Sequence, residues 1–322
     1  MKVDVKECAR LLLGHNKILI LTHAHPDGDT LGCGFGLCRA LLKLGKEARV
    51  INADDIPKKY DYLYDDMENL DFREEYIVSV DTATENLLGD LANTYGGKID
   101  LCIDHHGTNA YYAKCTLMEE VAAACEIIYR LILEMEKISG QKNLIDKKIA
   151  DCLYTGISTD TGCFRYASST PETYRIAADL MALGADNGTI NRVMFETKTK
   201  PYCMLEKEAI NGLKMFENDR IAVITITQEM YEKTGTTEQD TEAIAPLTRQ
   251  IEGVEIGITI REKKDGTCKA SFRTYGINAA EIASAFGGGG HRQASACRLN
   301  ENVGTTTKLI VEKCREILNG RD

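Results

Sequence analysis

The first half of the chain alternates short, uninterrupted apolar runs with stretches whose apolar residues recur at helical spacing. The runs cover residues 17–22, 47–52, 76–80 and 99–103, and the helical stretches cover 31–44, 121–135 and 145–157. Strands that are apolar on both faces and separated by helices are typical of a parallel sheet buried between helices. This half is therefore predicted to form an α/β domain with helices on both faces of a parallel sheet.

The pattern changes near residue 185. Residues 187–216 are rich in charges and fit helices, 220–227 fit a strand, and 254–260 with 267–272 fit a hairpin around Lys264-Asp265-Gly266. A helix, a glycine run, a short strand and a final helix follow. Since 322 residues are enough for about two domains, we expect a first domain over 1–185, a helical linker over 186–215 and a smaller α/β domain over 216–322.

Composition limits the partners. The 39 Lys and Arg residues against 49 Asp and Glu residues give a net charge of −10. Long duplex nucleic acid is bound mainly by neutralising its phosphates, so it is an unexpected partner, whereas small phosphorylated ligands need only a local cluster of donors.

The twelve cysteines form no CxxC pair, and the N-terminus lacks a signal-peptide layout, which favours reduced thiols in the cytoplasm. No run approaches the roughly 18 apolar residues that span a membrane.

Five of the six histidines fall within three short motifs, and the first motif is THAHPDGD at residues 22–29. It follows the first apolar run directly, at the position where open α/β sheets bind ligands. His23, Asp27 and Asp29 offer one imidazole and two carboxylates, a donor set that suits Mn²⁺ or a related divalent ion better than a structural zinc. An acidic turn that caps the next helix explains this motif equally well when it is taken alone.

Three further elements carry the same kinds of side chain. Asp81 ends the run 76–80, Asp104-His105-His106 ends the run 99–103, and Asp160 lies in GISTDTG at 156–162. A lone Asp is more often a helix cap, Asp104 could orient a ligand imidazole, and adjacent histidines should have different roles. Taken together, such groups at one sheet edge would repel one another unless cations neutralised them. The set predicts a two-metal hydrolytic site.

The last motif is FGGGGHR at residues 286–292. Glycines let backbone N–H groups approach an anion, and His291 with Arg292 adds side-chain donors. A flexible helix end is the alternative, and a glycine run alone favours it. Arg273, at the end of the hairpin strand, could face the same pocket, although an exposed surface arginine is the more common situation.

With HAHPDGD, VSVD, DHH, STDTG and GGGGH in this order, the chain resembles the DHH-family phosphoesterases that carry a C-terminal DHHA1 domain. Within that family it resembles the bacterial bifunctional oligoribonucleases and PAP phosphatases, or nanoRNases. The resemblance covers nearly the whole chain. It implies a parallel-sheet DHH domain, a smaller α/β DHHA1 domain across a cleft, and two Mn²⁺ ions in the first domain.

The resemblance also implies roles for single residues. The first ion would be held by His23, Asp27 and Asp81, and the second by Asp29, Asp81, His105 and Asp160, with Asp81 bridging. His106, over the scissile phosphate, and Asp104 would be the catalytic pair. The rest of the substrate would be held by Arg273, Gly288, Gly289, Gly290, His291 and Arg292. The chain departs from the family at residues 122–125, AAAC, where members often have Ser or Thr, and at the variable position His25.

We therefore expect hydrolysis of short single-stranded RNA to nucleoside monophosphates and of 3′-phosphoadenosine 5′-phosphate (PAP) to AMP, by a two-metal mechanism. A phosphodiesterase for pApA or cyclic di-AMP is the alternative, because the same catalytic parts would serve it. A nucleotide-binding regulator without catalysis is a third interpretation, which the complete set of expected metal ligands disfavours. A homodimer is compatible with the sequence.

Overall fold

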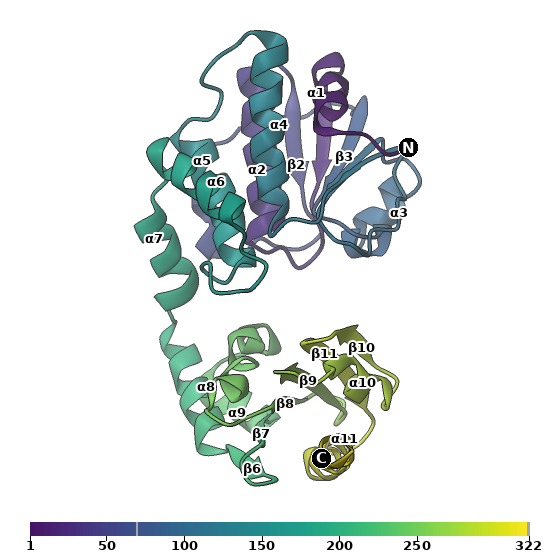
Figure 1. Cartoon of the computed structure of the whole chain (residues 1–322), viewed down its shortest axis with the longest axis vertical. Coiled ribbons are helices and arrows are strands. Elements are labelled where there is room, and N and C mark those ends of the chain that lie inside the picture. The colour runs from purple at the N-terminus through teal and green to yellow at the C-terminus, as the bar shows by residue number, and fades with distance from the viewer. Residues whose placement is uncertain (69, 321–322) are drawn as a thin grey trace. The chain divides into compact units, whose positions relative to one another are not determined.

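The computed structural model describes residues 1–68 and 70–320, and the chain divides into two compact units, Met1–Thr197 and Lys198–Asp322 (Figure 1). The division falls within the charged segment 186–215, for which the sequence predicts a helical linker. The helices of this segment are α7 (Asn187–Asn191), a π-helical turn (Arg192–Glu196) and α8 (Lys200–Asn211).

The first unit contains a five-stranded sheet in the order β2-β1-β3-β4-β5, and every pair in it is parallel. The strands are β1 (Ile18–Leu21), β2 (Ala48–Ile51), β3 (Tyr76–Val80), β4 (Leu101–Asp104) and β5 (Cys115–Met118). The predicted parallel sheet is confirmed. Strand β5 was not predicted, because it is a four-residue edge strand whose ends are only half-buried and so shows no apolar run.

Helices cover both faces of this sheet, as Figure 1 shows. Alternate strand residues point to opposite faces, so Ile18 and Ile20 share a core with α1, α2, α4 and α5, whereas Leu19 and Leu21 pack with the segment around α3. The helices are α1 (Val5–Gly14), α2 (Gly28–Lys43), α3 (Leu91–Tyr95), α4 (Ala124–Ser139), α5 (Lys147–Asp160) and α6 (Pro171–Ala182), with 3₁₀ turns at Lys58–Leu63 and Glu85–Leu88. The predicted α/β class is confirmed.

The second unit contains a six-stranded sheet in the order β10-β11-β9-β8-β7-β6. Only the β7–β8 pair is parallel among its described strands, and the predicted hairpin is β8–β9. The strands are β6 (Lys214–Phe216), β7 (Ile221–Ile226), β8 (Ile256–Glu262), β9 (Cys268–Thr274), β10 (Gly289–His291) and β11 (Ala294–Leu299). The helices are α9 (Gln228–Thr234), α10 (Ala279–Ser284) and α11 (Val303–Asn319), with 3₁₀ turns at Glu238–Ile244 and Leu247–Gln250.

The glycine run forms strand β10 rather than an open loop. A Cβ on Gly288 would lie 2.2 Å from the carbonyl oxygen of Ala296, and one on Gly290, where φ is +141°, would lie 2.6 Å from Cα of Ser295. Gly288 and Gly290 therefore lie too close to β11 for a side chain, whereas a Cβ on Gly287 or Gly289 would meet no atom within 4 Å. Close pairing with β11 is the physical reason for at least these two glycines.

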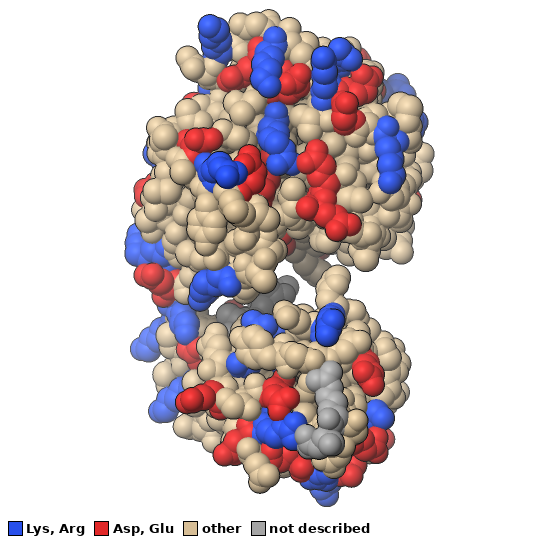
Figure 2. Space-filling model, viewed as in Figure 1, with Lys and Arg blue, Asp and Glu red and all other residues tan. Residues whose placement is uncertain are grey.

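All twelve cysteines are free thiols, as the sequence predicts. Within residues 1–68 and 70–320, no helix is both long and apolar enough to cross a membrane. Basic and acidic side chains are interspersed on the face of each unit that Figure 2 shows.

Candidate metal centre

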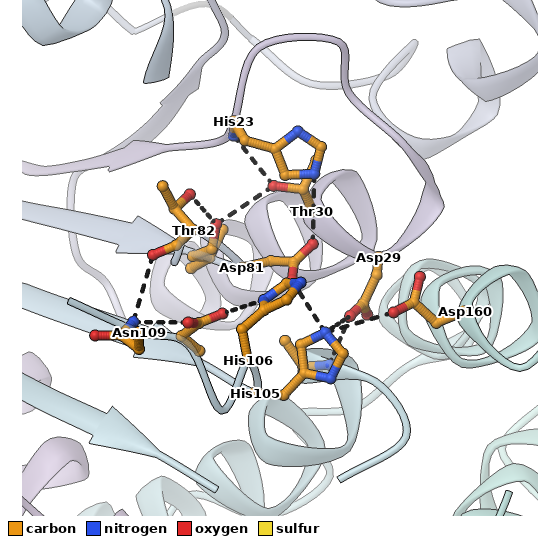
Figure 3. Close-up of polar contacts among 12 residues, drawn as sticks. His23, Asp29, Thr30, Asp81, Thr82, His105, His106, Asn109 and Asp160 are labelled. Atoms are coloured by element: carbon orange, nitrogen blue, oxygen red, sulfur yellow. Dashed lines mark hydrogen bonds and ion pairs between the residues drawn. The ribbon is translucent and has the colours of Figure 1, made fainter. Parts of the chain in front are cut away.

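Side chains from four segments meet at the carboxyl-terminal edge of the first sheet (Figure 3). One segment runs from the end of β1 into the first turn of α2, two follow β3 and β4, and the fourth is the last turn of α5. All six residues expected to bind metal lie in these segments, and the structure brings them together in two overlapping groups. They are His23, Asp27, Asp29, Asp81, His105 and Asp160.

The first group surrounds the imidazole of His23. Its Nε2 lies 3.6 Å from Oδ1 of Asp27 and 3.5 Å from Oδ2 of Asp81. Its Nδ1 lies 2.8 Å from the carbonyl oxygen of Ala24, which can accept a hydrogen bond from Nδ1–H and so fix the orientation of the ring. This contact turns Nε2 toward the two carboxylates, as in metal sites where a backbone carbonyl orients the ligand histidine.

The second group surrounds the imidazole of His105. Its Nε2 lies 3.4 Å from Oδ1 of Asp81, 3.5 Å from Oδ2 of Asp160 and 3.9 Å from Oδ2 of Asp29. Its Nδ1 is held by the carbonyl oxygen of Val121 at 3.0 Å. Oδ2 of Asp81 thus faces His23, whereas Oδ1 faces His105 and also lies 3.6 Å from Nδ1 of His106. This carboxylate therefore belongs to both groups.

Asp81 reaches this position at a conformational cost. Its φ is +52°, a left-handed conformation that is uncommon for residues other than glycine and that clusters at functional sites. Only 3% of the residue is exposed. Oδ1 of Asp81 and Nε2 of His105 are buried and have no hydrogen-bond partner among the described residues.

These observations test whether the residues fit divalent cations. The separations of 3.4–3.9 Å around His105 are too long for good hydrogen bonds. Donor atoms that share one small cation, each about 2.1 Å from it, lie roughly 3–4 Å apart. Two buried, unpaired donor atoms at that spacing fit a cation between them, and the set of oxygen and imidazole donors fits Mn²⁺ or Mg²⁺ chemistry.

The pKa values of these side chains also favour bound cations. Burial, and then the negative charge of Asp81, raises the pKa of Asp29 to about 7, and burial together with Asp29 raises the pKa of Asp160 well above its usual value. Burial alone would lower the histidine pKa values, but their carboxylate partners outweigh it and raise them to about 11 for His23 and about 10 for His105. Without cations, this edge of the sheet therefore retains protons.

Asp29 has a second set of contacts that the sequence did not predict. Its Oδ2 accepts a hydrogen bond from the backbone N–H of Ala124 (2.6 Å), and its Oδ1 accepts one from the N–H of Cys125 (3.0 Å). The N-cap residue of α4, Ala123, makes no side-chain cap. The carboxylate of Asp29 therefore caps α4 and meets the positive end of its dipole, in the segment where family members often have Ser or Thr.

His106 takes a different role from His105. Its Nδ1 lies 2.8 Å from Oδ1 of the fully buried Asp104, whose Oδ2 accepts a hydrogen bond from Nδ2 of Asn109 at 2.6 Å. The hydrogen bond to Asp104 raises the pKa of His106. Burial opposes ionisation of Asp104, but His106 and Asn109 lower its pKa. Asn109 was missed, since one polar residue in a loop is not a distinctive signal.

In the second unit, the expected substrate-binding residues do not all lie together. Arg273, Gly289 and Gly290 line one hollow of about 480 Å³. Gly288 packs against β11, and His291 and Arg292 are exposed and are not among the residues that line this hollow.

Parallel strands whose ends gather two imidazoles and four carboxylates around unpaired buried ligand atoms are typical of hydrolases that use divalent metal ions. Residues 17–157 match the model of the DHH family, N-terminal domain, and residues 218–319 match that of the DHHA1 domain. The chain belongs to this DHH/DHHA1 phosphoesterase family, whose members are metal-dependent hydrolases. The resemblance inferred from the motifs is confirmed.

Individual relatives agree with this assignment. The chain is 29% identical over 312 residues to the bifunctional oligoribonuclease and PAP phosphatase NrnA of Thermus thermophilus, covering 94% of this chain and 90% of that protein. It is 23% identical over 337 residues to the cyclic-di-AMP phosphodiesterase GdpP of Geobacillus thermodenitrificans, covering 96% of this chain and 49% of that one. An exopolyphosphatase-related protein from Bacteroides fragilis has the same fold, with a TM-score of 0.87, 24% identity and coverage of 97% and 96%.

Proposed function

We propose that the protein hydrolyses short oligoribonucleotides to nucleoside monophosphates, and PAP to AMP, with two bound divalent metal ions. The observation that carries the proposal is the pair of donor groups that share Asp81, one around His23 and one around His105. Pairs of metal ions at this kind of site occur in phosphatases and nucleases, where they stabilise the attacking and leaving oxygens. The similarity to NrnA over nearly the whole of both chains supports the choice of substrates.

The proposed ions are Mn²⁺. The first is held by His23, Asp27 and Asp81, and the second by Asp29, Asp81, His105 and Asp160. When bound, such ions supply a water that loses its proton near neutral pH and neutralise charge on the phosphoryl oxygens. The four carboxylates among these ligands balance the charge of two divalent cations.

His106 is proposed to act directly on the substrate. Its Nδ1 is held by Asp104, which leaves Nε2 to donate a hydrogen bond or a proton to the phosphate or to the leaving group. The hydrogen bond from His106 to Asp104 raises the pKa of His106 and so favours the protonated ring, the form that a general acid needs. Asp104 and Asn109 act through His106 and position its ring.

The second unit is proposed to hold the parts of the substrate that do not react. Arg273, Gly288, Gly289, Gly290, His291 and Arg292 are the candidates that the family motif assigns to this task. Their ligands would be short single-stranded RNA or small nucleotides. The net charge of −10 disfavours long duplexes as partners.

A panel of substrates tests the proposal. Purified protein with Mn²⁺ is incubated with short RNAs, PAP, pApA and cyclic di-AMP, and product release is measured with and without a chelator. Turnover of short RNA and PAP that the chelator abolishes is the expected result. Turnover of pApA or cyclic di-AMP alone would favour the alternative supported by the likeness to GdpP, and turnover of none would overturn both.

A further inference from the structure

The first motif contains a second imidazole, which takes no part in the two donor groups. His25 lies between His23 and Asp27, in the segment that runs from β1 into α2. Its Nδ1 lies 2.6 Å from Oδ2 of Asp54, and its backbone N–H donates a hydrogen bond to the same oxygen at 2.9 Å. One carboxylate oxygen therefore holds both the ring and the backbone of His25.

Asp54 is itself fixed to the segment that carries His23. It follows β2, the neighbour of β1, at the same carboxyl-terminal edge of the sheet. Its backbone N–H donates a hydrogen bond to Oδ1 of Asn52 at 2.9 Å. Nδ2 of Asn52 donates to the carbonyl oxygen of His23 and to Oγ1 of Thr22, both at 2.7 Å. These contacts fix the ring of His25 beside the candidate metal centre.

The backbone of His25 adopts a left-handed conformation, with φ at +56°. Such a φ is uncommon for residues other than glycine and clusters at functional sites, where surrounding contacts maintain it. The side chain is nevertheless 89% exposed, so packing of the ring does not account for this conformation. The hydrogen bonds to Asp54 therefore present the ring to solvent at the edge of the sheet where the donor groups meet.

The contact with Asp54 determines which ring nitrogen is available to a ligand. A carboxylate accepts hydrogen bonds, so the proton of the neutral ring lies on Nδ1 and the lone pair lies on Nε2. Nε2 forms no hydrogen bond within the described part of the chain. A free imidazole lone pair suits a hydroxyl group that can donate a hydrogen bond.

Both proposed substrates have such a hydroxyl group next to the reacting bond. In short RNA and in PAP, the scissile phosphate is attached to the 3′ oxygen of a ribose, and the 2′-hydroxyl lies on the adjacent carbon. Deoxyribose has only hydrogen there, and the 2′-hydroxyl is the group by which proteins distinguish RNA from DNA.

We propose that Nε2 of His25 accepts a hydrogen bond from the 2′-hydroxyl of the ribose that carries the scissile phosphate, and that Asp54 positions the ring for this contact. The inference rests on the proposed function and deepens it. It assigns a preference for ribose over deoxyribose to two side chains of the first unit, neither of which is an expected metal ligand.

A comparison of two substrates tests the inference. The kcat/KM values for PAP and for 2′-deoxyadenosine 3′,5′-bisphosphate are measured with the full-length protein and Mn²⁺. One hydrogen bond between neutral groups predicts that wild type prefers PAP by about 2- to 10-fold. His25→Ala should abolish this preference and keep the wild-type Mn²⁺ content. His25→Asn should do the same, and because Asn readily adopts a left-handed conformation, this variant separates loss of the ring from a change of the backbone.

Asp54→Ala tests the positioning role. It should lower the preference for PAP, and combining it with His25→Ala should lower the preference no further, because both substitutions act on one contact. A wild-type preference in Asp54→Ala would overturn this role. A merely structural effect would change the kcat/KM values for both substrates equally and leave their ratio unchanged.

His15→Asn is the matched control. His15 precedes β1, at the opposite edge of the sheet, where its Nδ1 lies 2.7 Å from the carbonyl oxygen of Leu11. This variant should keep the wild-type preference. The inference is wrong if wild type does not prefer PAP, if either His25 variant keeps the preference, if His25→Ala loses Mn²⁺, or if His15→Asn loses the preference as well.

Failure of the inference and failure of the proposed function are separable. Turnover of PAP and of its deoxy analogue with equal kcat/KM would overturn the inference and leave the function standing. If no phosphoester is hydrolysed, the function fails, and PAP then survives long enough for calorimetric titration in the presence of Mn²⁺. Tighter binding of PAP than of its deoxy analogue in wild type, but not in His25→Ala, would support the inference, and equal affinities in wild type would overturn it.

Discussion

Replacing Asp81 by asparagine removes one charge at the point that both donor groups share. Asn has nearly the same size as Asp, so the packing of this buried residue is kept. The two oxygens of Asp81 lie 3.5 Å from Nε2 of His23 and 3.4 Å from Nε2 of His105. The substitution therefore weakens both groups at once, without a cavity.

The expected loss of affinity for Mn²⁺ follows from charge balance. The four carboxylates of Asp27, Asp29, Asp81 and Asp160 balance two divalent cations, whereas three carboxylates leave an excess positive charge in a buried site. A unit charge 4 Å from another interacts by about 4 kcal/mol at an effective dielectric constant of 20. If relaxation leaves only about 3 kcal/mol of this, the affinity for Mn²⁺ falls about 100-fold. At least one of the two ions should then be lost.

Mn²⁺ content measured by elemental analysis after gel filtration, together with calorimetric titration, gives the stoichiometry. We expect two ions in wild type and at most one in Asp81→Asn. His25→Ala is the matched control, because His25 belongs to the same motif as His23 but is exposed and paired with Asp54; it should keep both ions. Asp81→Asn protein that binds two ions with wild-type affinity would refute the bridging role.

Three further predictions concern the candidate metal centre and strand β10. His106→Ala should keep its metal and lose about 10²–10⁴-fold in turnover if it is the general acid, whereas His105→Ala should lose an ion; equal metal content in the two variants would contradict this division. The fold raises the pKa of Asp29 to about 7 from an unfolded value near 3.9, so the metal-free protein should lose stability as pH rises from about 4 to 7. The increase in Tm caused by Mn²⁺ should grow over that range, because the ion then has fewer protons to displace. An increase in Tm that does not change with pH would argue that Mn²⁺ displaces no protons. Gly290→Ala should destabilise the second unit by about 1–3 kcal/mol, since its Cβ would lie 2.6 Å from Cα of Ser295, and Mn²⁺ binding should not change. A denaturation midpoint equal to that of wild type would show that β10 can move away from β11.

The location of the candidate metal centre could be predicted from the sequence because it follows from the topology of the sheet. His23, Asp81 and His105 come directly after apolar runs, and parallel strands end at the same edge of a sheet. No long-range information is needed to bring such residues together once the strands are recognised. Strands without an apolar run escaped this reasoning. Strand β5 is a half-buried edge strand, and β10 contains glycines whose pairing partner β11 the local sequence does not reveal. The prediction of helices over 187–216 was wrong at its end, where the three-residue, largely exposed edge strand β6 (Lys214–Phe216) lies.

Contacts between side chains and partners far away in the sequence could not be predicted from the sequence. Asp29 meets the N–H groups of Ala124 and Cys125, and nothing near residue 29 signals that α4 begins there. The sequence around Asp29 also fits an acidic turn that caps the next helix. Asp27 does cap that helix, α2, whereas Asp29 caps α4.

The double use of Asp29 ties the folding of α4 to the metal centre. A carboxylate that accepts two N–H groups at a helix start is fixed in orientation, so its oxygens face His105 without the support of a hydroxyl from residues 122–125. The two backbone donors and the helix dipole offset part of the cost of burying this charge, while burial and the charge of Asp81 still raise the pKa of Asp29 to about 7. Helix α4 therefore begins without a side-chain cap from Ala123, because a residue distant in the sequence accepts hydrogen bonds from its first N–H groups.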